Sequence, residues 1–111
     1  MDPKLVLKIV IFLSFLNSYS IDSVNYYFDS NYSGETKSGL SKKSPFKNLK
    51  KIRTIILNPG DSIFLANGSY FQGNIKLQNK SDIYITNYGS NQKPLPIIDS
   101  KGHIAGIFIE N

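Results

Sequence analysis

The chain has 111 residues, no cysteine and a formal net charge of +5. This length allows at most one domain. The lack of cysteine excludes disulfide bonds, so a small domain has to gain its stability from packing or internal repetition. Seven tyrosines and seven phenylalanines favour strands over helices.

The first 20 residues have the layout of a secretory signal peptide. An apolar run at 5–16 follows Lys4, and Ser18 and Ser20 place small residues at positions −3 and −1 of a cleavage site. The run is shorter than the roughly 20 residues that span a bilayer, and a retained anchor or a buried first strand is the alternative. We therefore expect export, a secreted or cell-surface location and no membrane association after cleavage.

Residues 21–60 are expected to form an N-terminal cap. Val24–Asp29 is rich in β-branched and aromatic residues and predicts a strand, which a loop at 30–44 follows. An amphipathic α-helix should come next, because Ser44 is a good N-cap and Pro45 suits the first helical position. The helix should end before Asn58-Pro59-Gly60, because proline disfavours a helical residue before it. The apolar stripe of this helix consists of Phe46, Leu49, Ile52 and Ile56.

Positive charge is concentrated on and just before this predicted helix. Six basic residues lie there: Lys42, Lys43, Lys47, Lys50, Lys51 and Arg53. Such a patch attracts an acidic partner, which from the charge alone is a polysaccharide, a nucleic acid or a membrane surface. The alternative is a solvated helix face.

From Asp61 onward, short strands alternate with turns. The predicted strands are Ser62–Ala66, Asn74–Leu77, Asp82–Asn87, Pro96–Asp99 and Ile107–Glu110. Three segments share a pattern of aliphatic, aromatic, aliphatic, small or polar residue, then asparagine. These copies end at Asn67, Asn87 and Asn111 and recur after 20 and then 24 residues. Repeats at such intervals are typical of a solenoid.

The repeat predicts how the strands pack. Because side chains alternate along a strand, the aliphatic residues of each copy should point one way and the aromatic residues the other. Stacked copies would align the aliphatic side chains inside, and asparagines on successive copies would hydrogen-bond to each other. The stripe before the first copy would close the open end of the core. Ile-rich strands of an antiparallel sandwich are the alternative.

Several segments together carry a family resemblance. They are Tyr26–Asp29, Ser44–Leu49, Asn58–Leu65, Asn67–Phe71 and Pro96–Asn111. In this order they resemble the start of secreted right-handed parallel β-helix proteins of the pectate-lyase-like superfamily. The resemblance implies a group of polysaccharide lyases, glycoside hydrolases, epimerases and non-catalytic surface proteins. In the lyases a Ca²⁺ ion and a Lys or Arg base act on central coils. No residue of this chain matches those positions, so catalytic residues, metal ligands and cofactor stay unassigned.

We therefore expect a mainly β fold. It would hold the first two to three coils of a right-handed parallel β-helix over 61–111, truncated, with a capping α-helix in 21–60. The expected function is that of an N-terminal fragment of an exported protein that binds or degrades acidic polysaccharide. If the intact protein is an enzyme, the resemblance implies a lyase or glycoside hydrolase, and this chain alone would be inactive.

Two alternatives come from other classes of function. One is a non-catalytic surface or adhesive β-solenoid, and the other is a truncated gene product without independent activity. No nucleic-acid partner is expected. An uncapped C-terminal strand edge favours self-association.

Aromatic side chains are the candidate carbohydrate contacts. They offer stacking surfaces if their aliphatic neighbours face inward. Packing against the loop at 30–44 is the alternative. The candidates are Tyr70, Tyr84 and Tyr88, together with Lys76.

The acidic residues and the single histidine are weaker candidates for chemistry. Asp61 is expected to cap a turn and not to bind Ca²⁺, since no further acidic residue lies nearby in the sequence. His103 would need a partner within hydrogen-bond reach to act as a general base. Asp82 and Asp99 would form a catalytic carboxylate pair only if the strands bring them together, and turn capping is the default.

Three Asn-x-Ser motifs are acceptors for N-linked glycans if the host modifies exported proteins. They are Asn31-Tyr32-Ser33, Asn67-Gly68-Ser69 and Asn79-Lys80-Ser81.

Overall fold

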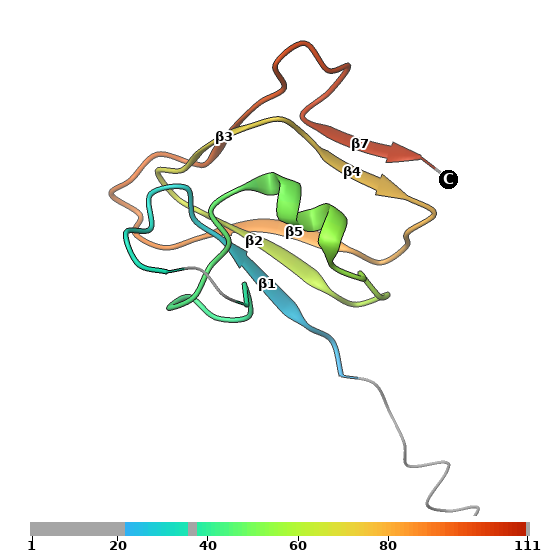
Figure 1. Cartoon of the computed structure of the whole chain (residues 1–111), viewed down its shortest axis with the longest axis horizontal. Helices are drawn as coiled ribbons and strands as arrows, with labels where there is room; N and C mark the ends of the chain where they lie inside the picture. The colour runs from blue at the N-terminus through green and yellow to red at the C-terminus, as the bar shows by residue number, and fades with distance from the viewer. Residues whose placement is uncertain (1–21, 36–37, 111) are drawn as a thin grey trace, which may run out of the picture.

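The computed structural model describes residues 22–35 and 38–110, so the predicted signal segment at 1–20 and the last asparagine lie outside the described residues (Figure 1). The elements are β1 (Asn25–Phe28), the 3₁₀ helix η1 (Leu49–Thr54), β2 (Ser62–Ala66), β3 (Tyr70–Gln72), β4 (Ile75–Gln78), β5 (Tyr84–Tyr88), β6 (Ile97–Asp99) and β7 (Ile107–Glu110).

The strands form three small parallel sheets. The first sheet has the order β1–β2–β5, the second pairs β3 with β6, and the third pairs β4 with β7. After passing through β2, β3 and β4, the chain returns to the same three sheets in the same order through β5, β6 and β7. Figure 1 shows the third sheet at the top, with β4 and β7 side by side. The predicted mainly β class is confirmed.

A hydrophobic core fills the space between the sheets. Alternate residues of β2 and β4 point inward, as the period of two requires, so Ile63 and Ile75 are fully buried. The segment around η1 closes this core with further apolar side chains. The buried cluster comprises Phe28, Phe46, Leu49, Ile52, Leu57, Ile63, Leu65, Phe71, Ile75 and Leu77.

The predicted α-helix is wrong in type and length. The helix is a 3₁₀ helix that begins at Leu49, after the N-cap Asn48, whose side chain accepts a hydrogen bond from the Lys50 N–H at 2.8 Å. Phe46 precedes it in extended backbone and forms a parallel bridge with Phe28. Because Asn48 caps the chain here, Ser44 and Pro45 do not begin a helix.

The spacing of the apolar residues explains the tighter helix. Phe46, Leu49 and Ile52 follow one another at intervals of three positions and are all buried, and a 3₁₀ helix has three residues per turn. The predicted fourth member of the stripe, Ile56, is 77 % exposed. Ile55 packs against the core in its place.

The strands after residue 61 agree with the predicted segments in outline, with one addition and one correction of register. The addition is β3, which no predicted strand covers. β5 begins at Tyr84 because Asp82 has a φ of 55°, outside strand geometry. Ile63 consequently pairs with Ile85, and not with Ile83 as the repeat predicts.

The third copy of the repeat lies in a different sheet from the first two. β7 pairs with β4, so Ile107 lies beside Ile75 and Ile109 beside Leu77. The stacked copies of the repeat predict that β7 lies beside β5, and this prediction is wrong. Ile107 and Ile109 are 43 % and 61 % exposed, whereas their neighbours on β4 are buried. Self-association through this edge stays a prediction.

The predicted contact between asparagines on successive copies is confirmed for the first two. The Asn87 side-chain amide donates to Asn67 Oδ1 at 2.9 Å, and Asn67 Nδ2 donates to the Ser90 carbonyl at 3.1 Å. Asn67 is only 7 % exposed. Both the oxygen and the nitrogen of the Asn67 side-chain amide are therefore hydrogen-bonded in the turn that follows β2.

Candidate functional site

Three adjoining hollows cross the surface between η1 and the strands β3 and β4. The largest holds about 460 Å³ and shares Arg53, Asn74 and His103 with a smaller one. That one shares Leu49 and Gln72 with the third, of about 270 Å³. We call the three together the basic groove. Its polar, basic and aromatic lining residues are Ser30, Lys47, Asn48, Lys50, Arg53, Tyr70, Phe71, Gln72, Asn74, Lys76, His103 and Phe108.

The periods of η1 and β4 place the basic side chains of the groove toward solvent. In η1 the three-residue turn places Leu49 and Ile52 on one row toward the core, and Lys50 and Arg53 on the next row toward solvent. In β4 the period of two buries Ile75 and exposes Lys76. The helix and strand periods that bury the core residues thus also place the charged side chains at the surface.

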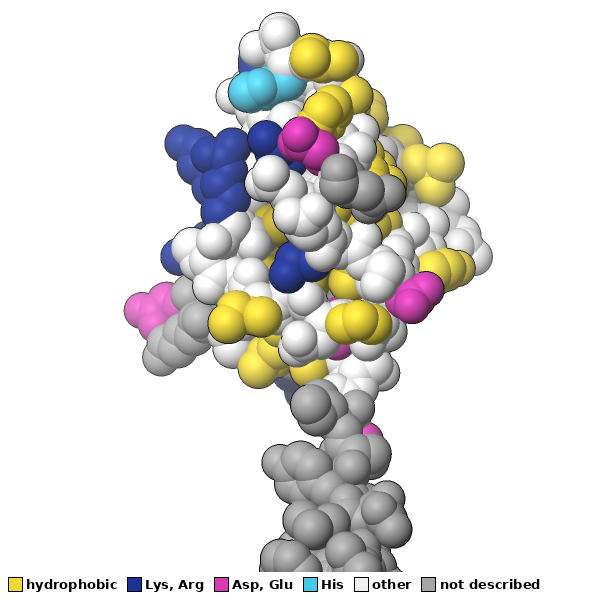
Figure 2. Space-filling model, turned by 90° about the vertical axis from the view of Figure 1, so that its right-hand side faces the viewer, with side chains coloured by type: hydrophobic (Ala, Val, Ile, Leu, Met, Phe, Trp, Pro, Cys, Tyr) yellow, Lys and Arg dark blue, Asp and Glu magenta, His cyan; other side chains and the backbone are white. Residues whose placement is uncertain are grey.

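The groove is positively charged. Lys47, Lys50, Arg53 and Lys76 line it, and neither aspartate nor glutamate is among its lining residues. Lys76 Nζ lies 5.8 Å from the Phe108 ring centroid and 3.8 Å from a Glu110 carboxylate oxygen. This ion pair is half exposed on both sides, so solvent screens it strongly. Figure 2 shows Lys and Arg side chains gathered beside the histidine on one face.

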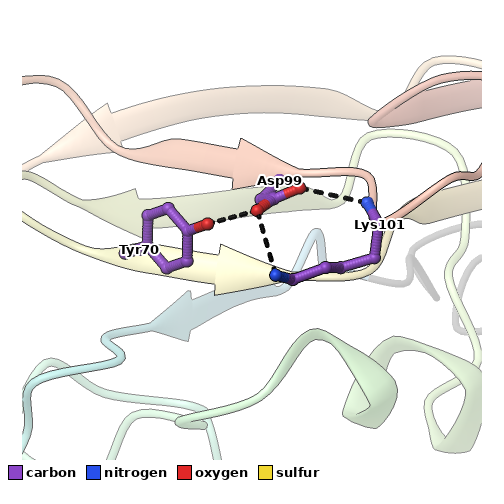
Figure 3. Close-up of polar contacts among 3 residues, drawn as sticks. All are labelled: Tyr70, Asp99 and Lys101. Atoms are coloured by element: carbon purple, nitrogen blue, oxygen red, sulfur yellow. Dashed lines mark hydrogen bonds and ion pairs between the residues drawn. The ribbon is translucent and has the colours of Figure 1, made fainter.

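A second polar cluster joins β3 to the end of β6 (Figure 3). The Tyr70 hydroxyl donates a hydrogen bond to Asp99 Oδ2. The Lys101 N–H donates to Asp99 Oδ1 at 3.1 Å, and Lys101 Nζ lies 3.4 Å from Oδ2. The hydrogen bond from Tyr70 is the main cause that lowers the pKa of Asp99, and the same bond raises the pKa of Tyr70. Tyr70 also lines the basic groove, so the cluster fixes one wall of it.

Tyr70→Phe is expected to raise the pKa of Asp99 toward its ordinary value of 3.8. The reason is loss of the hydrogen bond that favours the carboxylate. Because this pKa is lowered in the folded state, the stability that the bond contributes is present above the ordinary pKa and is lost as pH falls through the folded pKa. Carboxyl ¹³C NMR titration of Asp99 measures the shift. Tyr84→Phe is the control, and an unchanged Asp99 titration in Tyr70→Phe would contradict the assignment.

An aromatic cluster covers the outer face of the first sheet. The Tyr27 and Phe64 rings stack with centroids 5.2 Å apart, and Tyr88 meets Tyr27 edge-on at 5.4 Å. Lys42 Nζ lies 5.7 Å from the Tyr88 ring centroid. Burial, followed by the Asp29 carboxylate, raises the pKa of Tyr88 to about 12. Tyr88 is therefore partly covered by packing against the loop at 30–44, which was the alternative to a carbohydrate contact.

The structure does not bring the four predicted carbohydrate contacts together. Tyr70 and Lys76 line the basic groove, in different hollows. Tyr84 is 64 % exposed but belongs to β5 in the first sheet, as does Tyr88. Their role as carbohydrate contacts stays a prediction. The sequence reasoning missed the grouping of Arg53, His103 and Phe108 with Lys76, although the three-residue spacing of Lys47, Lys50 and Arg53 signals a common face.

The acidic candidates and the histidine lie in separate parts of the fold. Asp61 is 1 % exposed, and its two carboxylate oxygens accept the N–H groups of Val24 and Asn58, each at 2.8 Å. Capping is thus confirmed for Asp61. Asp82 precedes β5 in the first sheet, whereas Asp99 ends β6 in the second. His103 lines the groove in the loop before β7, and its backbone N–H donates to the Ser100 carbonyl at 3.0 Å.

Calcium, the metal that the resemblance implies, has no matching ligand set in the described part of the chain. Over 22–35 and 38–110, no three His, Cys, Asp or Glu side chains gather where they could hold a metal ion. The best acidic candidate, Asp61, uses both carboxylate oxygens for backbone N–H groups. No step is therefore assigned to a metal.

Comparison with known proteins yields no relative. No family model, curated protein or solved structure matches the chain. Among the helices of the described residues, none has the length and apolar character needed to cross a bilayer. The fold and the site thus define a mainly β protein of small parallel sheets that carries a basic surface groove.

Proposed function

We propose that this chain forms the opening coils of a right-handed parallel β-helix in an exported protein, and that its basic groove binds an acidic polysaccharide. The strand order supports the first half. Two successive passes through three sheets, with parallel pairing in each, are what a parallel β-helix requires. Crossover connections between parallel strands are right-handed in nearly all proteins. The resemblance to the pectate-lyase-like superfamily agrees with this arrangement.

The single observation that carries the binding half is the charge of the groove. Four basic side chains line the three adjoining hollows, and neither aspartate nor glutamate is among the lining residues. The Glu110 carboxylate that pairs with Lys76 is half exposed, so solvent screens it. A chain of negative groups can contact several of these cations at once, whereas a small anion can reach only one or two. Linked contacts of this kind raise affinity without any single strong interaction.

The remaining lining residues favour a sugar polymer among polyanions. Asn48, Gln72 and Asn74 offer amide donors and acceptors for hydroxyl groups. Tyr70 and Phe108 place aromatic surfaces at the two ends of the groove. We assign binding to the groove and not glycoside hydrolysis, because most glycoside hydrolases use a pair of carboxyl groups and the groove lining has none.

Binding to polygalacturonate tests this function. The double variant Arg53→Gln/Lys76→Gln should bind about tenfold more weakly at low salt, since each exposed ionic contact is worth up to about 1 kcal/mol. The control Lys43→Gln/Lys93→Gln removes the same charge at exposed positions outside the groove. It should bind like the unmodified chain. Isothermal titration calorimetry measures both.

Four outcomes would contradict the proposal. They are no binding, equal weakening by the control variant, equal binding of neutral galactan, and tighter binding of a DNA duplex than of polygalacturonate. A steady rise in unsaturated-uronate absorbance during incubation would contradict the assignment of the groove to binding alone.

A further inference from the structure

We infer that Asn79 is the position at which this fold accepts an N-linked glycan. Asn-x-Ser is the acceptor motif for such glycans, and the chain has it at Asn31, Asn67 and Asn79. The surroundings of the three side chains differ sharply, so the structure selects among them. The inference rests on export, which is part of the proposed function, but not on polysaccharide binding.

The motif at Asn67 is unsuitable in the folded protein. Asn67 is 7 % exposed, its Nδ2 donates to the Ser90 carbonyl, and its Oδ1 accepts from Asn87. The hydroxyl-bearing residue of the same motif, Ser69, is 2 % exposed. A glycosyltransferase cannot reach either side chain until this corner opens.

The motif at Asn31 is exposed but held in place. Asn31 Nδ2, the atom that would be modified, donates to the Gly68 carbonyl at 2.9 Å. Its backbone N–H donates to Asp29 Oδ1 at 2.9 Å. Modification here has to compete with both hydrogen bonds.

The motif at Asn79 is displayed on the turn between β4 and β5. Asn79 is exposed, with a φ of 53°, and Ser81 is exposed as well. The Asn79 N–H donates to the Glu110 carbonyl at 2.8 Å, and Lys80 Nζ donates to the Leu57 carbonyl at 3.1 Å. Within the described residues no hydrogen bond engages the Asn79 side chain. The backbone of the motif is thus anchored while the reacting amide is accessible.

The reaction is a glycosyl transfer from a polyprenyl-diphosphate oligosaccharide. The Asn79 Nδ2 forms a bond to the anomeric carbon of the sugar. The bond from that carbon to the diphosphate oxygen breaks, the amide proton passes to a base of the enzyme, and polyprenyl diphosphate leaves. No oxidant or reductant is required.

Transfer to the folded full chain by a purified single-subunit oligosaccharyltransferase tests the inference without export. Synthetic peptides of 63–72 and 75–84 give the intrinsic reactivity of the motifs at Asn67 and Asn79. Relative to the peptides, Asn67 in the folded chain should react about tenfold or more slowly than Asn79, because it becomes accessible only by local opening. Glycopeptide mass spectrometry gives the occupancy of each motif.

Two variants sharpen the result. Ser81→Ala should abolish modification at Asn79, whereas Ser33→Ala should leave it unchanged. Equal relative rates at Asn67 and Asn79, or higher occupancy at Asn31 than at Asn79, would overturn the inference. Expression of the full chain in eukaryotic cells tests export separately, because recovery in the medium is scored independently of glycan occupancy.

Discussion

Asp61→Ala is expected to lower the free energy of unfolding by about 3–6 kcal/mol, because its carboxylate accepts two hydrogen bonds and each bond to a charged group contributes about 1.5–3 kcal/mol. Its carboxylate is 1 % exposed and accepts two backbone N–H groups from Val24 and Asn58, which would both lose their partner. These bonds join the entrance of β1 to the turn before β2. Folded domains have a free energy of unfolding of only about 5–15 kcal/mol in total, so this loss is a large fraction of the stability.

Urea unfolding followed by circular dichroism measures this loss. Asp61→Asn keeps one acceptor oxygen but presents an N–H to the other donor, so it should fall between Asp61→Ala and the unmodified chain. Asp82→Asn is the matched control, because Asp82 is exposed and asparagine tolerates its φ of 55°. It should change stability by less than about 0.5 kcal/mol. An unfolding midpoint of Asp61→Ala equal to that of the control would show that the cap is dispensable.

Gly39→Ala should destabilise the fold by about 2–5 kcal/mol, the sum of about 1–3 kcal/mol for overpacking and about 1–2 kcal/mol for a left-handed backbone. Gly39 has a φ of 69°, and a Cβ there would lie 2.1 Å from Cε2 of Phe46. The Phe46 ring cannot retreat freely, because it is buried and packs on Phe28 with centroids 5.2 Å apart. The Gly39 carbonyl also accepts the Tyr27 N–H at 2.7 Å, which ties this loop to β1.

Gly102→Ala separates the two contributions to this loss. Gly102 has a φ of 84°, but nothing lies within 4 Å of the position of its Cβ. Alanine there should cost only the backbone term of about 1–2 kcal/mol. Thermal unfolding of both variants measures the difference. Equal losses would mean that contact with the Phe46 ring does not contribute.

The basic residues of the run at 42–53 lie on two different surfaces of the fold. Lys42 lies over the Tyr88 ring on the outer face of the first sheet, while Lys47, Lys50 and Arg53 line the basic groove. Composition alone treats these residues as one patch. The groove gains its fourth cation, Lys76, from a strand that follows more than twenty residues later, so the site is a product of the fold.

The sequence by itself determined the features that depend on neighbouring residues, namely strand alternation and capping. The alternation in Ser62–Ala66 predicts a strand with Ile63 and Leu65 inward, and the structure has it within the same bounds. The position of Asp61 after Pro59-Gly60 predicts a cap, because its carboxylate can reach nearby N–H groups. The prediction of an α-helix is wrong because apolar residues three positions apart, as at Phe46, Leu49 and Ile52, suit a 3₁₀ turn as well as an α-helix.

Only the tertiary structure decided which strands pair and which charges meet. Ile83 and Ile85 are equivalent in a repeat pattern, and the left-handed backbone at Asp82 selects Ile85 as the neighbour of Ile63. β7 resembles β2 in sequence yet pairs with β4, because strand pairing depends on the path of the chain between strands as well as on side-chain type. The physical reason is the sequence separation over which each interaction acts. Alternation and caps act over a few residues, whereas register and the basic groove depend on contacts between segments far apart in the chain.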